Sequence, residues 1–251
     1  MKDNAVIACL IRTWSDNADI VATVNRVISS GIGHVLVVVK DDDPAHEGQV
    51  ESRLADLVRA HEGRITILAM REGYSWSNAL NYGFDEVRRM NLRAAELGAP
   101  RIAYVLNVSN EAWYSREDVE ALLTEAETDE CIGAVGTTFQ GWQDDRPIEL
   151  GASYAHPRNT MLLVRFSAYL AIGGFDPRCD QLGGQEDIDW LMRLAQTGGR
   201  WSLIDRNVKL LIPQGFDQVK KEARERKAMV DMARVHEEVA ERFAEFAKGL
   251  R

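Results

Sequence analysis

Short runs of apolar residues alternate along the chain with longer segments in which apolar positions recur every three or four residues. The runs lie at residues 5–11, 35–39, 65–69, 101–106, 132–139 and 160–164. Their length and branched side chains are typical of strands covered on both faces. The segments at 16–28, 50–58, 76–97 and 115–123 have helical spacing instead. Strands alternating with helices predict an α/β fold with a doubly wound, mostly parallel sheet.

Capping residues mark two of the expected helix starts. Ser15 or Asp16 can cap the first helix, and Ser115 with Asp118 forms a start like a capping box. In a doubly wound sheet, ligands bind beyond the carboxyl ends of the strands. The stretches 12–14, 40–43, 71–77 and 107–113 are therefore the places to look for a site.

The composition changes at about residue 217, where charged residues begin to dominate. A narrow apolar stripe follows at helical spacing, formed by Met232, Val235, Val239, Phe243, Phe246 and Leu250. We expect an α/β domain over 1–216 and an amphipathic helical extension over 217–251. The stripe fits a helix packed on the domain, or the seam of a homodimer.

Charge and cysteine content narrow the function classes. The 30 basic and 39 acidic residues give a formal charge of −9, which argues against a nucleic-acid partner. The cysteines Cys9, Cys131 and Cys179 lie far apart, as expected of reduced thiols. The N-terminus has no long apolar run after a basic start, and no run of about 18 apolar residues occurs anywhere. We expect no signal peptide, no transmembrane segment and a cytoplasmic location.

Residues 172–199, IGGFDPRCDQLGGQEDIDWLMRLAQTGG, carry the most informative pattern. They resemble the GGFD…GxEDxDxxxRxxxxG signature of GT-A glycosyltransferases, both the family-two group and the β-1,4-galactosyltransferase-like group. The matching positions are Gly173, Gly174, Phe175, Asp176, Gly184, Glu186, Asp187, Asp189, Arg193 and Gly198. The blocks VLVVVKDDD at 35–43, SNALNYGFDEV at 77–87 and YVLNVSNE at 104–111 follow the family's order, so the resemblance covers about residues 4–216.

The resemblance implies the GT-A fold and transfer of a sugar from a nucleoside diphosphate sugar to an acceptor hydroxyl, with inversion. Such a transfer needs a carboxylate that removes the proton of the attacking hydroxyl. By resemblance the base is Asp187, and Glu186 binds the acceptor. Acidic residues are also stabilised in any first helical turn by the helix dipole, which is the structural alternative for this pair.

The same resemblance implies a nucleotide site at the strand ends. Asp41 occupies the position of the family's acid that contacts the nucleoside, with Thr13 as a neighbour of the base or ribose. The remaining candidates are Asp43, Asn78, Asn81, Asn107 and Ser109. Amides at a helix start suit a diphosphate, which is why the asparagines of the third helix are included. For the aspartates at 41–43, a solvated turn before Pro44 is the alternative.

One departure from the family concerns metal binding. Asn107-Val108-Ser109 stands where most GT-A enzymes carry the DXD carboxylates, and no histidine occurs at 211–217. Hard cations prefer anionic oxygen, so we expect no metal ligand and weak dependence on Mg²⁺ or Mn²⁺. Asn110 and Glu111 are the alternative ligands in a shifted geometry. Without a metal, charge for the leaving diphosphate would come from arginine or lysine at the strand ends, namely Arg12, Lys40, Arg71 or Lys209.

Four tryptophans, Trp14, Trp76, Trp113 and Trp142, fall at expected loop or cleft positions. Aromatic faces pack well on sugar rings, and Trp142 in the polar stretch 140–159 is the candidate for acceptor binding on a lid. The lost DXD also suggests a second hypothesis, a non-catalytic GT-A-like module that binds nucleotide or glycan. Glu186, Asp187 and Arg193 argue against it, because a binding module needs no base.

Overall fold

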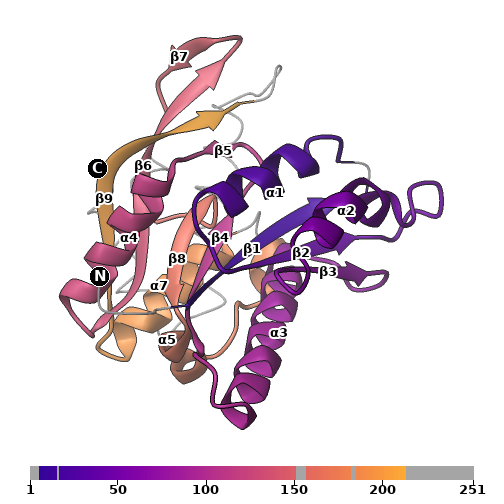
Figure 1. Cartoon of the computed structure of the whole chain (residues 1–251). Helices are drawn as coiled ribbons and strands as arrows, with labels where there is room; N and C mark the ends of the chain where they lie inside the picture. The colour runs from indigo at the N-terminus through magenta and orange to yellow at the C-terminus, as the bar shows by residue number, and fades with distance from the viewer. Residues whose placement is uncertain (1–5, 16, 151–156, 182–184, 213–251) are drawn as a thin grey trace.

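The computed structural model describes residues 6–15, 17–150, 157–181 and 185–212, and within them one curled sheet of nine strands runs through the molecule (Figure 1). The strands are β1 (Val6–Trp14), β2 (His34–Lys40), β3 (Ile65–Met70), β4 (Ile102–Val108), β5 (Ala112–Trp113), β6 (Ile132–Gln143), β7 (Arg146–Ile148), β8 (Met161–Arg165) and β9 (Arg200–Leu211). Their order is β3-β2-β1-β4-β8-β6-β9-β5, with β7 paired to β6.

Most of the residue pairing in the sheet is parallel. β3, β2, β1 and β4 are parallel neighbours, as are β6 and β9. β8 is antiparallel to both β4 and β6, and it therefore begins where β4 ends. This reversal brings the start of β8 to the edge at which β1 and β4 finish.

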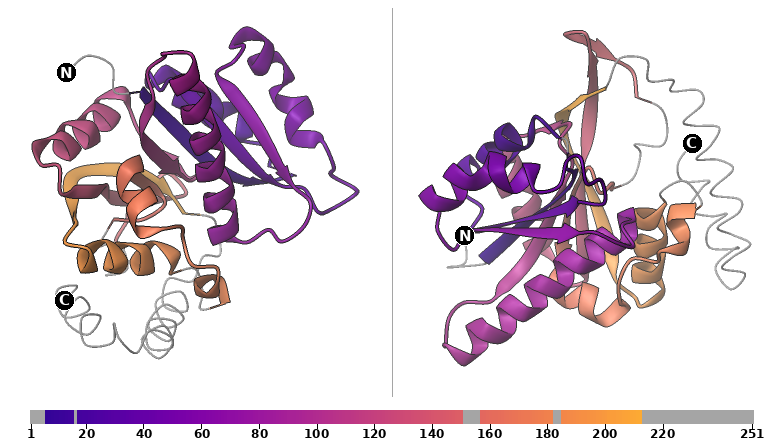
Figure 2. Two further views of the ribbon diagram at one scale, coloured as in Figure 1. Left: turned by 90° about the horizontal axis from the view of Figure 1, so that it is seen from below. Right: turned by 90° about the vertical axis from the view of Figure 1, so that its right-hand side faces the viewer.

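Helices cover both faces of the sheet (Figure 2). They are α1 (Ile20–Ser29), α2 (Gln49–Ala60), α3 (Trp76–Glu96), α4 (Arg116–Thr128), α5 (Phe166–Ile172), α6 (Arg178–Gln181) and α7 (Glu186–Gln196). One core packs beneath α1, α2 and α4, and a second packs beneath α3, α5 and α7. The fold is therefore α/β with helices on both sides of a mostly parallel sheet.

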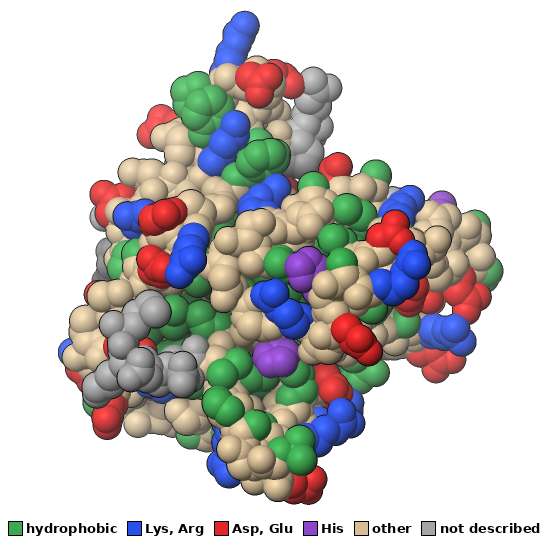
Figure 3. Space-filling view, viewed as in Figure 1, with side chains coloured by type: hydrophobic (Ala, Val, Ile, Leu, Met, Phe, Trp, Pro, Cys, Tyr) green, Lys and Arg blue, Asp and Glu red, His purple; other side chains and the backbone are tan. Residues whose placement is uncertain are grey.

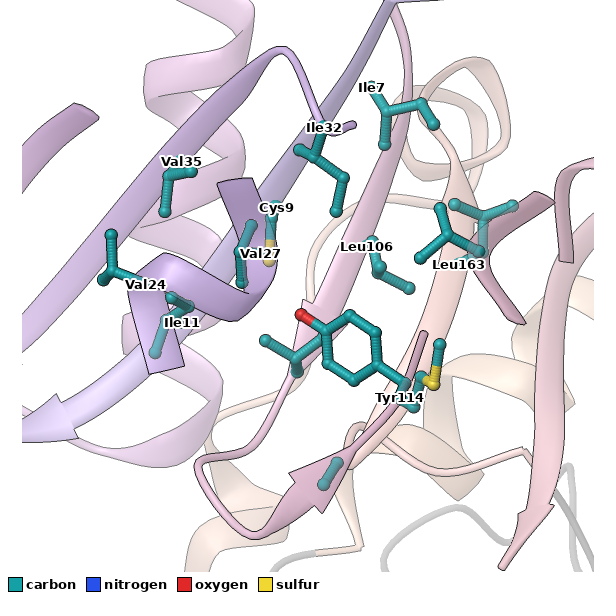
Figure 4. Packing of buried hydrophobic residues seen from close by; sticks show 14 of the residues in the cluster. Ile7, Cys9, Ile11, Val24, Val27, Ile32, Val35, Leu106, Tyr114 and Leu163 are labelled. Atoms are coloured by element: carbon teal, nitrogen blue, oxygen red, sulfur yellow. The ribbon is translucent and has the colours of Figure 1, made fainter. Parts of the chain in front are cut away.

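The two cores follow from the period of two along each strand. In β1, Ile7, Cys9 and Ile11 belong to the first core, whereas Ala8 and Leu10 belong to the second. Val35, Val37 and Val39 of β2 face the first core, and Leu36 and Val38 the second. Figure 4 shows the first core, where Val24 and Val27 of α1 point toward the sheet and the ring of Tyr114 lies among the apolar side chains.

Several predicted elements are confirmed, and others need correction. The capping box of Ser115 and Asp118 is present at the start of α4. The first helix begins later than predicted, at Ile20, and its N-terminal residue Asp19 makes no side-chain capping bond. The predicted strand 132–139 continues to Gln143 as β6 and turns back through β7. The extension 217–251, its boundary at 216 and the homodimer seam lie outside the described residues.

The long strand β9 was not predicted. Its residues Asp205–Asn207 are polar and exposed, Asn207 has a φ of 49°, and the pairing with β6 shifts register before Val208. None of the helices in the described ranges is both long and apolar enough to cross a membrane. On the face seen in Figure 3, acidic and basic side chains are intermixed.

Candidate active site

A clamp between α3, α7 and the turn at 173–176 fixes where α7 begins. The side chain of Asn81 donates to the Phe175 carbonyl (2.8 Å) and accepts from the Phe175 amide (2.8 Å). At Gly174, a Cβ atom would lie 2.5 Å from Asn81 Oδ1, so the close approach requires glycine. Arg193 Nη2 donates to the Gly174 carbonyl (2.7 Å) and also contacts Asp189 Oδ2 (2.8 Å). Several residues of the family-like signature therefore make contacts that hold the fold together.

The clamp presents two buried carboxylates at the start of α7. Glu186 and Asp187 are 5% and 3% exposed, and each faces an arginine. Arg12 Nη1 lies 3.2 Å from Glu186 Oε1, and Arg158 Nε lies 3.2 Å from Asp187 Oδ2. Asn159 joins the two, because its side-chain amide donates to Glu186 Oε1 and its backbone amide to Asp187 Oδ2, both at 3.2 Å.

Two neighbouring strands supply the other members of this network. Arg12 lies near the end of β1 on the same face as Ala8 and Leu10, and Asn107 of β4 pairs in register with Leu10. Alternation therefore turns both polar side chains toward α7 at the carboxyl edge of the sheet. Asn107 Nδ2 donates to Asn159 Oδ1 at 3.0 Å. The sequence-predicted residues Asn107, Glu186 and Asp187 are thus brought together.

Several buried polar atoms at this edge have no hydrogen-bond partner among the described residues. They are Glu186 Oε2, Asn107 Oδ1, Ser109 Oγ, Asn110 Oδ1 and both polar atoms of the Gln185 side chain. Native proteins rarely leave buried polar groups unpaired, so a group of them needs an explanation. A polar ligand or bound water at this edge would satisfy them.

Aromatic side chains flank the network. The Arg12 guanidinium lies over the Trp76 ring, 4.7 Å from its centroid, and Trp14 meets Trp76 edge-on at 4.9 Å. Trp14 is 41% exposed, so the pair lies at the surface beside the carboxylates. Tyr74 packs against Trp76, and burial raises the pKa of its hydroxyl to about 12. This hydroxyl therefore stays protonated at neutral pH.

The start of α3 already holds an anion of the chain itself. The Asp180 carboxylate accepts from the Ser77 amide (3.2 Å), and Ser75 Oγ accepts from the Asn78 amide. Burial, and next to it the charge of Glu186, raise the pKa of Asp180, while hydrogen bonds from Ser75 and Ser77 oppose the shift. Asn78 donates its side chain to the Gly73 carbonyl. At the start of α3, where a diphosphate was expected, the Ser77 amide thus donates to the carboxylate of Asp180.

The remaining nucleotide candidates lie on the other face of the same edge. Thr13 is fully buried, and its hydroxyl accepts from Asn17 Nδ2 at 2.7 Å. Asp41, expected to be exposed at a strand end, is only 5% exposed because the residues before α2 cover it, and its Oδ1 accepts from the Gly48 amide. Asp43 is exposed, and hydrogen bonds from the Ala45 amide and the His46 ring lower its pKa.

No protein-family model matches the chain, and no curated protein matches it significantly. The chemistry of the site must therefore be argued from the residues themselves. In the described ranges no three His, Cys, Asp or Glu side chains gather as a metal-ligand group. At the position of the expected DXD, Asn107 and Ser109 offer neutral oxygens.

Trp142 was expected to lie on a lid, but it lies in a strand. It is near the end of β6, paired with Pro147 of β7 and Leu211 of β9. Lys209 Nζ lies 4.3 Å from the Trp142 ring centroid and 5.9 Å from that of Trp113. Among the described residues, no contact links this aromatic cluster directly to Glu186 or Asp187.

Arg158, Asn159, Gln185 and Asp180 also belong to this site, and the sequence pattern did not predict them. Arg158 and Asn159 fell inside the polar stretch treated as an insert, although their position just before an apolar run was visible. Their partners lie 27 to 29 residues away along the chain, and no local sequence pattern predicts such a contact. Asp180 lies between the GGFD and GxED parts of the signature, at a position that the signature does not specify.

Proposed function

We propose that this protein is an inverting glycosyltransferase that uses a nucleoside diphosphate sugar. The observation that carries the proposal is the pair of buried carboxylates, Glu186 and Asp187, at the carboxyl edge of β1 and β4. Each is matched by an arginine, Arg12 or Arg158. The combination offers a proton acceptor and positive charge in one place, which sugar transfer from a diphosphate requires.

In this proposal the two carboxylates divide the work on the acceptor. Glu186 Oε2 accepts no hydrogen bond from a described residue and binds an acceptor hydroxyl. Asp187 takes the proton of the attacking hydroxyl as the bond from the sugar to the diphosphate breaks. Asp187 Oδ2 now accepts from the Asn159 amide and faces Arg158. Proton transfer to Asp187 is favoured when Arg158 turns toward the departing diphosphate.

Arg12 and Arg158 are better placed to receive that charge than the other cations considered. Lys40 is paired with Asp42, Arg71 is paired with Glu47, and Lys209 lies against Trp142. Arg12 and Arg158 are both largely buried beside the carboxylates. A cation in a water-poor site interacts more strongly with developing charge than one in open solvent. The nucleoside would extend toward Thr13 and Asp41.

Calorimetry with UDP, GDP, dTDP and CMP tests the proposal. We expect one of the diphosphates to bind with a dissociation constant of about micromolar, or about 8 kcal/mol. Arg12→Gln should weaken that binding about tenfold, by loss of one charged contact. Arg71→Gln, an exposed cation near the same edge, is the matched control. A folded protein that binds none of the four ligands would refute the donor assignment.

The alternative function is a non-catalytic module that binds nucleotide or glycan, and turnover of a sugar donor, not nucleotide binding, distinguishes it from the enzyme. That hypothesis is favoured by the absence of the DXD carboxylates. Both hypotheses predict nucleotide binding, but only the enzyme releases nucleoside diphosphate from a sugar donor. Release measured with a panel of donor sugars and simple glycoside acceptors, and its loss in Asp187→Asn, separates them.

A further inference from the structure

A second pocket lies at the opposite edge of the sheet from the carboxylates. Its volume is about 410 Å³, and it lies where β4 begins, between the later turns of α3 and the start of α5. Pockets of this size accommodate small organic ligands. The lining that matters here comprises Arg88, Leu92, Arg101, Arg165 and Leu170. None of these residues belongs to the site already described.

The walls of this pocket are held rigidly. Asn91 of α3 donates to the Ile102 carbonyl (2.9 Å) and accepts from the Ile102 amide (2.6 Å), which ties α3 to the first residue of β4. Arg165, at the end of β8, donates to the carbonyls of Ile132 and Ala126. The shape of the pocket is therefore set by backbone contacts that do not involve its mouth.

The charge of the lining is opposite to that of the whole chain. The chain carries a formal charge of −9, yet the residues around this pocket include three arginines and no aspartate or glutamate. Arg88 and Arg101 form no ion pair with any described residue. Arginines without an ion-pair partner bind carboxylate or phosphate groups well, because the guanidinium offers several fixed donors.

The apolar part of the lining is unusually exposed. Leu92 is 60% exposed and Leu170 is 54% exposed, and both contribute to the pocket. Leucines with this exposure gain from covering by an apolar partner. The pocket thus places a pair of free cations next to an apolar wall.

We propose that this pocket binds an amphiphilic anion, with the anionic head on Arg88 and Arg101 and the apolar part against Leu92 and Leu170. The head is a phosphate or carboxylate, and the apolar part is a short alkyl chain. This site is separate from the proposed sugar transfer and does not depend on it.

Decyl phosphate, used below its critical micelle concentration, is the probe. Calorimetry should show saturable binding, weakened about tenfold by Arg88→Gln or by Arg101→Gln. Arg165 is left unchanged because its guanidinium holds backbone carbonyls. Arg93→Gln is the matched control, since Arg93 lies on the same helix but outside the lining, and it should bind as the unchanged protein does.

Further binding measurements distinguish a single amphiphilic anion from a cationic amphiphile and from a membrane surface. Decyltrimethylammonium tests the sign of the charge, and vesicles of phosphatidylglycerol or phosphatidylcholine test a membrane surface. Binding of decyl phosphate that is lost in both arginine variants and kept in Arg93→Gln supports the proposal. Equal binding by all variants, equal binding of the cationic amphiphile, or binding to vesicles alone would each overturn it.

Discussion

Asn81 and Phe175, which are 94 residues apart, form a reciprocal pair in which one side chain satisfies both backbone groups of the other residue. The geometry is that of a short β-bridge made by an amide side chain. It attaches the middle of the second core to the turn that precedes α7. Asn81, which the sequence predicts as a diphosphate contact, thus also holds the backbone of the turn that leads toward α7.

Removal of this pair should destabilise the fold. Asn81→Ala leaves the Phe175 amide and carbonyl unpaired in a largely buried place, and we expect a loss of about 2–4 kcal/mol in the free energy of unfolding. Urea titration measures it. Asn78→Ala, which removes an exposed contact to Gly73 one turn earlier, should change stability by less than about 1 kcal/mol. A stable Asn81→Ala protein with weak nucleotide affinity would instead favour direct ligand contact.

Asp187→Asn should separate catalysis from binding. Turnover should fall by about 10²–10⁴-fold, the usual contribution of a positioned base, while donor affinity is nearly kept. Because the buried ion pair between Arg158 and Asp187 would be lost, we expect destabilisation of about 2–3 kcal/mol, more than for an exposed helix start. Steady-state kinetics at a temperature where the variant is folded measures turnover.

Glu186→Gln is the companion variant for the assignment of roles. It should raise the KM for the acceptor more than it changes donor affinity, because Glu186 Oε2 is the oxygen that faces the acceptor in our proposal. If Asp187→Asn keeps nearly full turnover and Glu186→Gln abolishes it, the base is Glu186 and the roles are exchanged.

Chelation of divalent metals should have little effect on turnover or nucleotide affinity. Asn107 and Ser109 provide neutral oxygens where a metal site would need carboxylates, and in our proposal Arg12 and Arg158 supply the positive charge. Activity is compared before and after exhaustive treatment with EDTA, and after addition of Mn²⁺. A large loss that Mn²⁺ restores would redirect attention to Asn110 and Glu111.

The pH dependence of stability should reveal Asp180. Burial raises its pKa above the unfolded value, so its contribution is fully present in acid and is lost as pH rises through the folded pKa. Asn cannot ionise. The free energy of unfolding of Asp180→Asn should therefore increase relative to that of the unchanged protein as pH rises from about 4 to 7. Urea titrations across this range measure the difference.

Asp43→Asn serves as the control with opposite sign. Hydrogen bonds to its carboxylate lower the pKa of Asp43, so its contribution is present above the unfolded pKa and is lost in acid. The relative stability of Asp43→Asn should therefore decline as pH rises through the acidic range to about 4, and it should stay level from about 4 to 7. A parallel course of the two variants would contradict the assignment for Asp180.

The sequence predicts the central strands well because their residues are apolar on both faces, as in Val35–Val39. It also predicts that Glu186, Asp187 and Asn107 belong to one site at the carboxyl edge of the sheet. It does not predict β9, because the polar residues Asp205–Asn207 interrupt the apolar pattern. Nor does it predict Arg158 and Asn159 as partners of α7, because their contacts depend on β8 running antiparallel to β4.

The alternation of β1 between two cores has a consequence for insertions and deletions. Arg12 reaches Glu186 because it lies two residues beyond Leu10, in step with the side chains that pack under α3 and α7. One residue added or removed between Leu10 and Arg12 would turn the guanidinium to the α1 side of the sheet, away from Glu186. Point substitutions in the apolar part of β1 do not change which face of the sheet Arg12 lies on. The length of the strand is therefore under stricter constraint than its composition.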